Sequence, residues 1–161
     1  MLETRKTEKT VSESRIEATY VVTPPDVNYL GNLAGGTLMH WMDLSAAIVG
    51  GRHANSVVVT ASVDSLEFRQ PIKLGEIVII KASVNRAFKS SMEIGVKVLS
   101  ENVITGEQKV CNRAYFTFVA IDENLRPIKV PEIIPESEDE KRRYEKAEVR
   151  RQIRLLNRGE I

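Results

Sequence analysis

The segment from residue 28 to residue 51 constrains the fold of this chain more than any other stretch. Residues 37–49, TLMHWMDLSAAIV, place apolar side chains in nearly every direction around a helix. A helix with no polar face is normally buried, so this segment predicts a central core helix that begins near Thr37. Gly50 and Gly51 predict that the helix ends there, because glycine is common at helix C-termini.

Asp43 is the one acidic residue inside this apolar segment. A buried carboxylate costs free energy unless it is paired, hydrogen-bonded or protonated. Asp43 is therefore a candidate catalytic acid or base. Two structural explanations stay open beside this one. Asp43 could bond a neighbouring backbone group, or it could form an ion pair with Arg52 or with a basic residue elsewhere.

The loop before the helix supplies groups that can bind a developing negative charge. Gly35 and Gly36 would allow a ligand to approach the backbone closely. The unpaired N–H groups at a helix N-terminus are suited to an oxyanion. Asn32 adds a side-chain donor in the same loop. A carboxylate, an amide and backbone donors in one short segment predict a catalytic site.

Most of the remaining chain consists of strand-like runs rich in β-branched residues. The last three runs follow one another through short turns, which predicts an antiparallel meander. Each has one apolar face, which is typical of a sheet covered on one side. We therefore expect an α+β fold in which the long helix lies in the curl of a five-stranded antiparallel sheet. The predicted strands are residues 16–22, 57–68, 77–88, 92–100 and 108–121.

Changes in composition divide the chain into three parts. Residues 1–13 are polar and predict a flexible N-terminus, residues 14–131 hold the predicted domain, and residues 132–161 form a charged tail. In the tail, Ser137 and Glu140 form a capping box, which predicts a second helix over residues 138–156.

The second helix is predicted to lie on the surface or against a partner chain, because its apolar stripe is thin. Its first turns carry acid–base pairs at i,i+4 spacing, Glu138 with Arg142 and Asp139 with Arg143. We interpret the basic patch near its end as a solvated helix face rather than a site for an anionic ligand. That patch consists of Arg150, Arg151, Arg154 and Arg158.

The composition excludes several classes of protein. A net charge of +1 argues against general nucleic-acid binding. Cys111 is the single cysteine and only two histidines are present, so neither a disulfide nor a zinc site is expected. His40 and His53 are interpreted as helix-surface or helix-end residues. The N-terminus lacks the apolar segment of a signal peptide, and no apolar run approaches the ~20 residues of a membrane helix, so we expect a cytoplasmic protein.

Four motifs follow one another along the chain: residues 31–43 (GNLAGGTLMHWMD), 59–75 (VTASVDSLEFRQPIKLG), 89–91 (KSS) and 116–120 (FTFVA). Together they resemble the hot-dog-fold acyl-CoA thioesterases. The similarity is to the branch with the broad-range bacterial acyl-CoA hydrolases and the brain and cytosolic acyl-CoA hydrolases. The resemblance implies a long helix wrapped by a curled antiparallel sheet, as the strand pattern also predicts.

The resemblance implies that the chain hydrolyses the thioester of fatty acyl-coenzyme A. By position in the motif, Asp43 would be the catalytic carboxylate, acting as a general base on water or as a nucleophile. Asn32 would orient water or polarise the thioester carbonyl, and the N–H of Gly36 would be the oxyanion donor. No metal or separate cofactor is implied, since coenzyme A is part of the substrate and product.

The resemblance also implies where coenzyme A lies and how the chains assemble. The Lys89-Ser90-Ser91 turn would lie near the pantetheine and phosphate part of coenzyme A, and Thr60 would line the same tunnel. One active site would be built across a homodimer, and the dimers would assemble further as a trimer of dimers. The expected ligand is acyl-CoA, with no nucleic-acid partner.

Two other functions compete with hydrolysis. A hot-dog hydratase would use a catalytic histidine with a carboxylate, but His40 lies three residues before Asp43, which is the wrong arrangement. A non-catalytic acyl-CoA-binding protein could keep the same fold without turnover. The presence of both Asn32 and Asp43 favours the enzyme.

Overall fold

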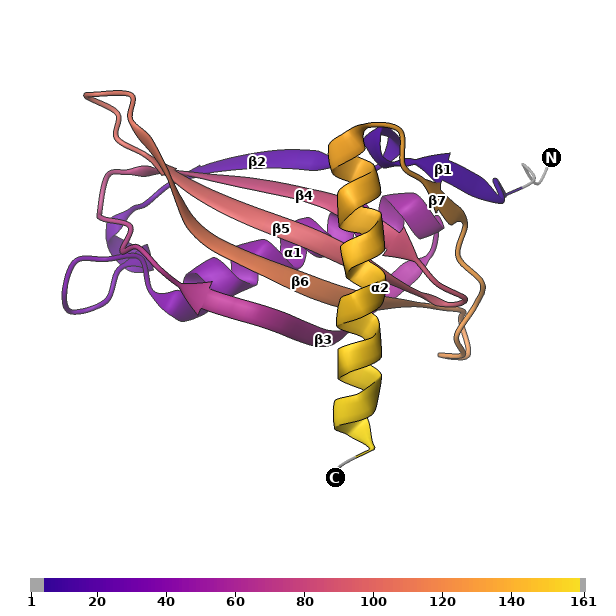
Figure 1. Cartoon of the computed structure of the whole chain (residues 1–161). Helices are drawn as coiled ribbons and strands as arrows, with labels where there is room; N and C mark the ends of the chain where they lie inside the picture. The colour runs from indigo at the N-terminus through magenta and orange to yellow at the C-terminus, as the bar shows by residue number, and fades with distance from the viewer. Residues whose placement is uncertain (1–4, 160–161) are drawn as a thin grey trace.

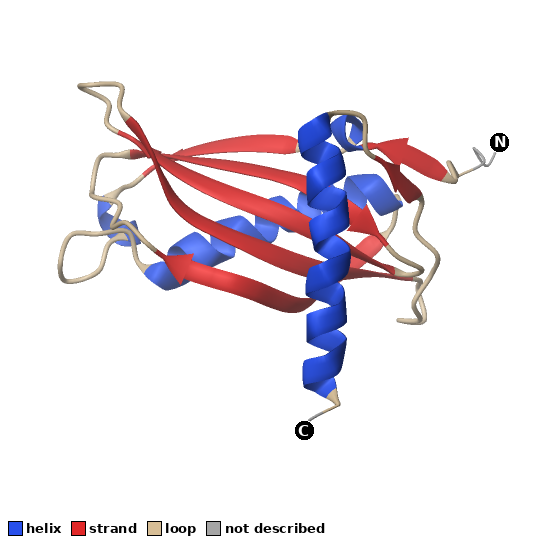
Figure 2. Ribbon diagram, viewed as in Figure 1, coloured by secondary structure: helices blue, strands red, loops and turns tan. Residues whose placement is uncertain are grey.

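The computed structural model describes residues 5–159 and shows one curled sheet with a helix on each face (Figures 1 and 2). The five strands lie in the order β2-β4-β5-β6-β3, and every neighbouring pair is antiparallel. This topology confirms the predicted α+β hot-dog architecture and the meander. The sheet strands are β2 (Ile16–Val21), β3 (Val57–Phe68), β4 (Ile77–Ala87), β5 (Ser91–Glu101) and β6 (Gln108–Ile121), and the helices are α1 (Gly35–Ala54) and α2 (Glu138–Arg158).

Helix α1 lies in the concave side of the sheet and forms the centre of the core. Met42, Ala46 and Val49 share one side of the helix, and none of them is exposed. They belong to one apolar cluster with core residues of the three central strands, among them Ile80, Ile94 and Phe118.

Neither α1 nor α2 combines the length and the apolar composition that a membrane-spanning helix requires, and the described residues contain no other candidate.

Both ends of α1 differ from the prediction. The helix begins at Gly35, before Thr37, and it continues through Gly50 and Gly51 to Ala54. It ends where Asn55 adopts the left-handed conformation with φ of 50°. A Cβ atom at Gly50 would lie 3.2 Å from Cδ1 of Ile94, so this glycine permits close packing of helix on sheet instead of ending the helix.

Contrary to the prediction, α1 is not buried on every side. Met39, Leu44 and Ile48 are 39–48% exposed in the single chain, and Asp43 is half-buried. Of the two interpretations of His53, helix-surface or helix-end, the second holds, because this residue lies in the last turn of α1. His53 is fully buried, and its Nε2 atom lies 2.7 Å from the carbonyl oxygen of Pro131. Burial lowers the pKa of the His53 imidazole, which favours the neutral ring.

Strand β3 is an edge strand with two irregularities in its pairing to β6. The register shifts between Thr60 and Ser62 and again between Asp64 and Glu67. Simple alternation along residues 57–68 therefore fails, because each bulge changes which face the following side chains occupy. As a result, Thr60 faces α1, whereas Asp64 faces α2 on the other side of the sheet.

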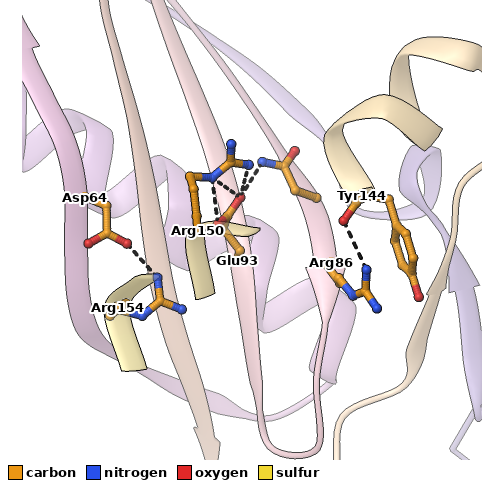
Figure 3. A network of polar contacts seen from close by, with 7 residues as sticks. Asp64, Arg86, Glu93, Tyr144, Arg150 and Arg154 are labelled. Carbon is orange, nitrogen blue, oxygen red and sulfur yellow. Dashed lines mark hydrogen bonds and ion pairs between the residues drawn. The ribbon is translucent and has the colours of Figure 1, made fainter. Parts of the chain in front are cut away.

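Helix α2 crosses the outer face of the sheet, so the sheet is covered on both sides and not on one (Figure 1). Ala147 is completely buried beneath the helix. Two arginines of the predicted solvated patch form ion pairs instead: Arg150 with Glu93 at 2.6 Å and Arg154 with Asp64 at 2.6 Å (Figure 3). Arg151 lies 4.3 Å from the Phe88 ring centroid, so this side of the helix packs on the sheet.

The chain termini are also more structured than predicted. Within residues 1–13, β1 (Glu8–Thr10) pairs in parallel with β7 (Glu132–Ile134), and Val11–Glu13 forms a 3-10 turn. Residues 1–4 of the predicted flexible segment lie outside the described residues. The acid–base pairs in the first turns of α2 form at i,i+3 spacing, Glu138 with Lys141 and Asp139 with Arg142.

We predict that Arg150→Met destabilises the fold. The Glu93 side chain is 1% exposed and accepts hydrogen bonds from both Arg150 and Asn85. Methionine keeps most of the packing but leaves this carboxylate without its cation, which typically costs about 3–5 kcal/mol. Urea unfolding measures the loss, with Arg142→Met as the control. The exposed Arg142 pair should contribute less than ~1 kcal/mol. Equal stability of the two variants would show that the Glu93 ion pair is dispensable.

Candidate functional site

The loop before α1 is folded on itself around the side chain of Asn28. Its Oδ1 atom accepts hydrogen bonds from the N–H groups of Leu30, at 3.0 Å, and Asn32, at 3.3 Å. The Asn28 N–H donates to the carbonyl of Asn32, and Gly31 adopts a φ of 75° that suits glycine. These bonds fix the Asn28 amide and leave its Nδ2 hydrogens available to a ligand.

The same loop is held against the chain that precedes β4. The N–H of Leu33 donates to the carbonyl of Ile72, and Asn32 forms an isolated bridge with Lys73. A cavity of about 350 Å³ lies here, a suitable volume for part of a small organic ligand. Its lining includes Asn28, Asn32, Leu38 and Phe68.

The first turn of α1 presents backbone donors to this loop. The N-cap residue is Ala34, which has no side chain that can accept from the first N–H groups. A Cβ at Gly35 would lie 3.3 Å from Cζ of Phe68, so glycine leaves room for that ring. A Cβ at Gly36 would meet nothing within 4 Å, so the backbone of Gly36 is open to an approaching group.

Asp43 is held by a single side-chain contact. The hydroxyl of Thr60 donates a 2.7 Å hydrogen bond to its Oδ1 atom, which joins α1 to β3. Among residues 5–159, no basic group lies within ion-pair distance of Asp43, so the possible pair with Arg52 does not form. The second oxygen, Oδ2, accepts no hydrogen bond from the described part of the protein. It can therefore act on a substrate.

The single chain does not bring all the predicted site residues together. It joins Asp43 to Thr60, and it places Asn32 and Gly35, the residue before Gly36, in the lining of one cavity. Gly36 and Asp43 are seven positions apart in the helix, or about 10 Å along the axis at ~1.5 Å per residue. Asp43 does not line the loop cavity. The carboxylate and the donors therefore form two separate halves within one chain.

The Lys89-Ser90-Ser91 turn lies at the far end of the sheet from the loop cavity. It follows β4, whereas Lys73 precedes β4 and contacts the loop. The length of β4 separates the two, roughly 33 Å at ~3.3 Å per residue. The backbone of the turn is held by the N–H groups of Ala120 and Val130, which donate to the carbonyls of Ser90 and Lys89.

Asn28 is a candidate site residue that sequence reasoning missed. It lies in the loop cavity, and its amide is better fixed than that of Asn32, whose side chain makes no hydrogen bond within residues 5–159. A signal was present, because asparagine commonly accepts from the backbone two residues later, as it does here. No group of three metal-ligating side chains occurs in the described residues.

Comparison with known proteins gives relatives across most of the chain. The Thioesterase superfamily model matches residues 30–107. An uncharacterised acyl-CoA thioester hydrolase of Bacillus subtilis, YkhA, is 41% identical over 128 residues, covering 80% of this chain and 74% of that protein. Mouse acyl-coenzyme A thioesterase 11 is 40% identical over 89% of this chain, but the match spans only 24% of the longer protein.

Solved structures are similar over nearly the whole chain. A Staphylococcus aureus acyl-CoA hydrolase in complex with butyryl-coenzyme A, coenzyme A and coenzyme A disulfide has a TM-score of 0.90 and 39% identity, covering 95% of this chain and 93% of that one. An apo-hexameric acyl-CoA thioesterase has a TM-score of 0.91 and 38% identity, covering 94% and 97%.

Alanine variants of the S. aureus hydrolase have also been solved, at its Asp43, Asn28 and Thr60. This chain carries the same three residue types at the same three numbers.

Proposed function

Because this chain belongs to the thioesterase superfamily, among the hot-dog-fold acyl-CoA hydrolases, we propose that it hydrolyses acyl-coenzyme A to a free fatty acid and coenzyme A. The proposal rests on one observation: the Asp43 carboxylate is half-exposed on α1 and is held there by a hydrogen bond from Thr60. The likeness to a hydrolase solved with butyryl-coenzyme A supports the substrate class.

Asp43 would act through its free oxygen. As a general base, Oδ2 takes a proton from water while the water oxygen bonds to the thioester carbon. The C–S bond then breaks, and the sulfur leaves with a proton as the thiol of coenzyme A. As a nucleophile, the same oxygen would attack the carbon directly, and water would hydrolyse the resulting anhydride. In either route, the Thr60 hydrogen bond keeps the carboxylate in one orientation.

The loop and the first turn of α1 would stabilise the thioester oxygen as it gains negative charge. We propose the N–H of Gly36 as one donor and a loop amide as the second. Asn32 remains a candidate for that amide. Asn28 has the stronger support, because both of its backbone hydrogen bonds hold the amide in place before a substrate arrives. The alanine variant of Asn28 made in the S. aureus hydrolase is consistent with this choice.

The complete site would be shared between two chains. A two-fold dimer brings the same patch of each chain together, so the loop of one protomer can face Asp43 of its partner. The exposed apolar side chains beside Asp43 on α1, Leu44 and Ile48, support burial against a second chain. The Lys89-Ser90-Ser91 turn would then contact coenzyme A. The hexameric relative supports further assembly of the dimers as a trimer.

A non-catalytic acyl-CoA-binding protein is the alternative. The first prediction about function separates the two possibilities. Purified protein should release thiol from palmitoyl-CoA, and Asp43→Ala should lower the rate at least ~100-fold, the scale of a positioned acid–base group. The variant should remain folded, which circular dichroism checks, because its carboxylate is half-exposed. Binding without thiol release by the wild type would identify a binding protein.

The second prediction distinguishes the two loop amides. Asn28→Asp keeps an oxygen that can accept from Leu30 and Asn32 but removes the Nδ2 donor. Loss of one oxyanion donor typically lowers kcat about 100- to 1,000-fold. Asn32→Asp is the matched control and should lower kcat less than ~10-fold. The opposite ranking would assign the role to Asn32.

The third prediction tests whether the site is shared between chains. Asp43→Ala is refolded in equal amounts with the less active of the two loop variants, Asn28→Asp or Asn32→Asp. Random pairing makes about half of the dimers mixed. In a mixed dimer one site carries both defects and the other carries none, so about a quarter of all sites should regain activity. If both groups acted from one chain, no site would recover, even with mixed dimers confirmed by mass.

A further inference from the structure

The outer face of the sheet carries a basic cleft that the proposed hydrolysis does not use. This cleft has a volume of about 870 Å³ and lies between α2 and strands β2, β4, β5 and β6. Asp43 and Thr60 lie on the other face of the sheet. Eight lining residues are basic and two are acidic, a net charge of +6 on a chain whose total is +1. The basic ones are Arg15, Lys81, Lys97, Arg113, Arg142, Arg143, Lys146 and Arg150.

Three of these cations form a row across neighbouring strands. Lys81 lies directly opposite Lys97, and Lys97 lies directly opposite Arg113. Like charges at directly opposed positions destabilise a sheet. With strands about 4.8 Å apart, the row is roughly 10 Å long. Glu17 lies opposite Lys81 and Glu67 lies opposite Arg113, so the repulsion centres on Lys97, which has a cation on both sides. An anion bound at Lys97 would relieve that repulsion.

The protein itself neutralises little of this charge. Within residues 5–159, Arg142 and Arg150 have close carboxylate partners, Asp139 and Glu93, and Lys81 lies 3.9 Å from Glu17. The other five basic residues of the cleft, Arg15, Lys97, Arg113, Arg143 and Lys146, have no carboxylate within 4.0 Å in the described part of the chain. Burial lowers the pKa of Lys97, and the charges of Arg113, Lys81 and Arg143 lower it further.

The Glu93 network gives the cleft a fixed wall. Arg150 binds Glu93 (Figure 3). The guanidinium carbon of Arg150 also lies 3.7 Å from the Tyr115 ring centroid, so α2 is held in place beside the row. Gly95 lies between the row and that network, and a Cβ there would clash with Nδ2 of Asn85 at 2.8 Å. Ser83 lies opposite Gly95 on the neighbouring strand. These two small residues leave open space between the basic side chains of the sheet and those of α2.

From this arrangement we propose that the cleft binds a small ligand with a chain of two or more phosphate groups, at a site separate from the acyl-CoA site. Lysine and arginine form strong, charge-assisted hydrogen bonds with phosphate oxygens. A diphosphate or triphosphate chain fits a row of cations roughly 10 Å long and can contact Arg143 and Lys146 of α2 at the same time. The volume lies within the usual range of small-molecule sites.

The test is calorimetric titration of the full chain with inorganic tripolyphosphate at low ionic strength. Lys97→Gln with Arg113→Gln removes two charges of the row, and Lys109→Gln with Lys129→Gln removes two exposed charges elsewhere. We expect one tripolyphosphate per chain, at least ~10-fold weaker binding by the row variant, and near wild-type binding by the control and by Asp43→Ala. ATP, titrated separately, distinguishes the ligand sources: equal affinity indicates a phosphate chain alone, and tighter binding indicates a nucleotide.

Several outcomes would overturn the proposal. Equal weakening in both double variants would indicate a diffuse charge effect, and a raised KM for palmitoyl-CoA in the row variant alone would assign the cleft to the substrate. Without ligand, the row variant should be at least as thermostable as wild type, because it removes like-charge contacts. Lower thermostability would indicate a structural role. A changed oligomeric mass in the row variant alone would indicate that another copy of the chain fills the cleft.

Discussion

The packing of α1 into the curl of the sheet is the interaction on which the rest of the structure depends. Met42, Ala46 and Val49, on one side of the helix, are buried against the central strands. Side chains one residue apart on a helix point about 100° apart at ~3.6 residues per turn. Asp43 is therefore turned away from the deepest packing and toward β3, where Thr60 meets it. The position of the carboxylate follows from the rotation of the helix that buries its neighbours.

The same helix also separates the groups that we propose act together in hydrolysis. Its N-terminus carries the backbone donors and the Asn28 loop, whereas Asp43 lies about two turns further along. One side of α1 is exposed, and β3 beside it is an edge strand with free backbone groups. A second chain at this edge would cover the exposed apolar residues and complete the site in one step.

On the outer face of the sheet, ion pairs hold α2 against the strands. Glu93 is buried beneath α2 and is neutralised by Arg150, with Asn85 completing its hydrogen bonds. A short distance away, Lys81, Lys97 and Arg113 lie in register without comparable neutralisation. Helix α2 thus stabilises one part of this face and forms one wall of a strongly basic cleft over another.

The sequence by itself determined the architecture, because burial patterns and short turns are local. The apolar helix, the five sheet strands and the meander of β4, β5 and β6 were all predicted from it. It also singled out Asp43 as a charge in an apolar segment. Only the tertiary structure decided that Asp43 is half-exposed and that β3 has bulges that bring Thr60 toward it. Only the structure showed that Arg150 and Arg154 bind carboxylates 57 and 90 residues away. These contacts join residues far apart in the chain, and no local spacing records which side chain will lie opposite another once the sheet has curled.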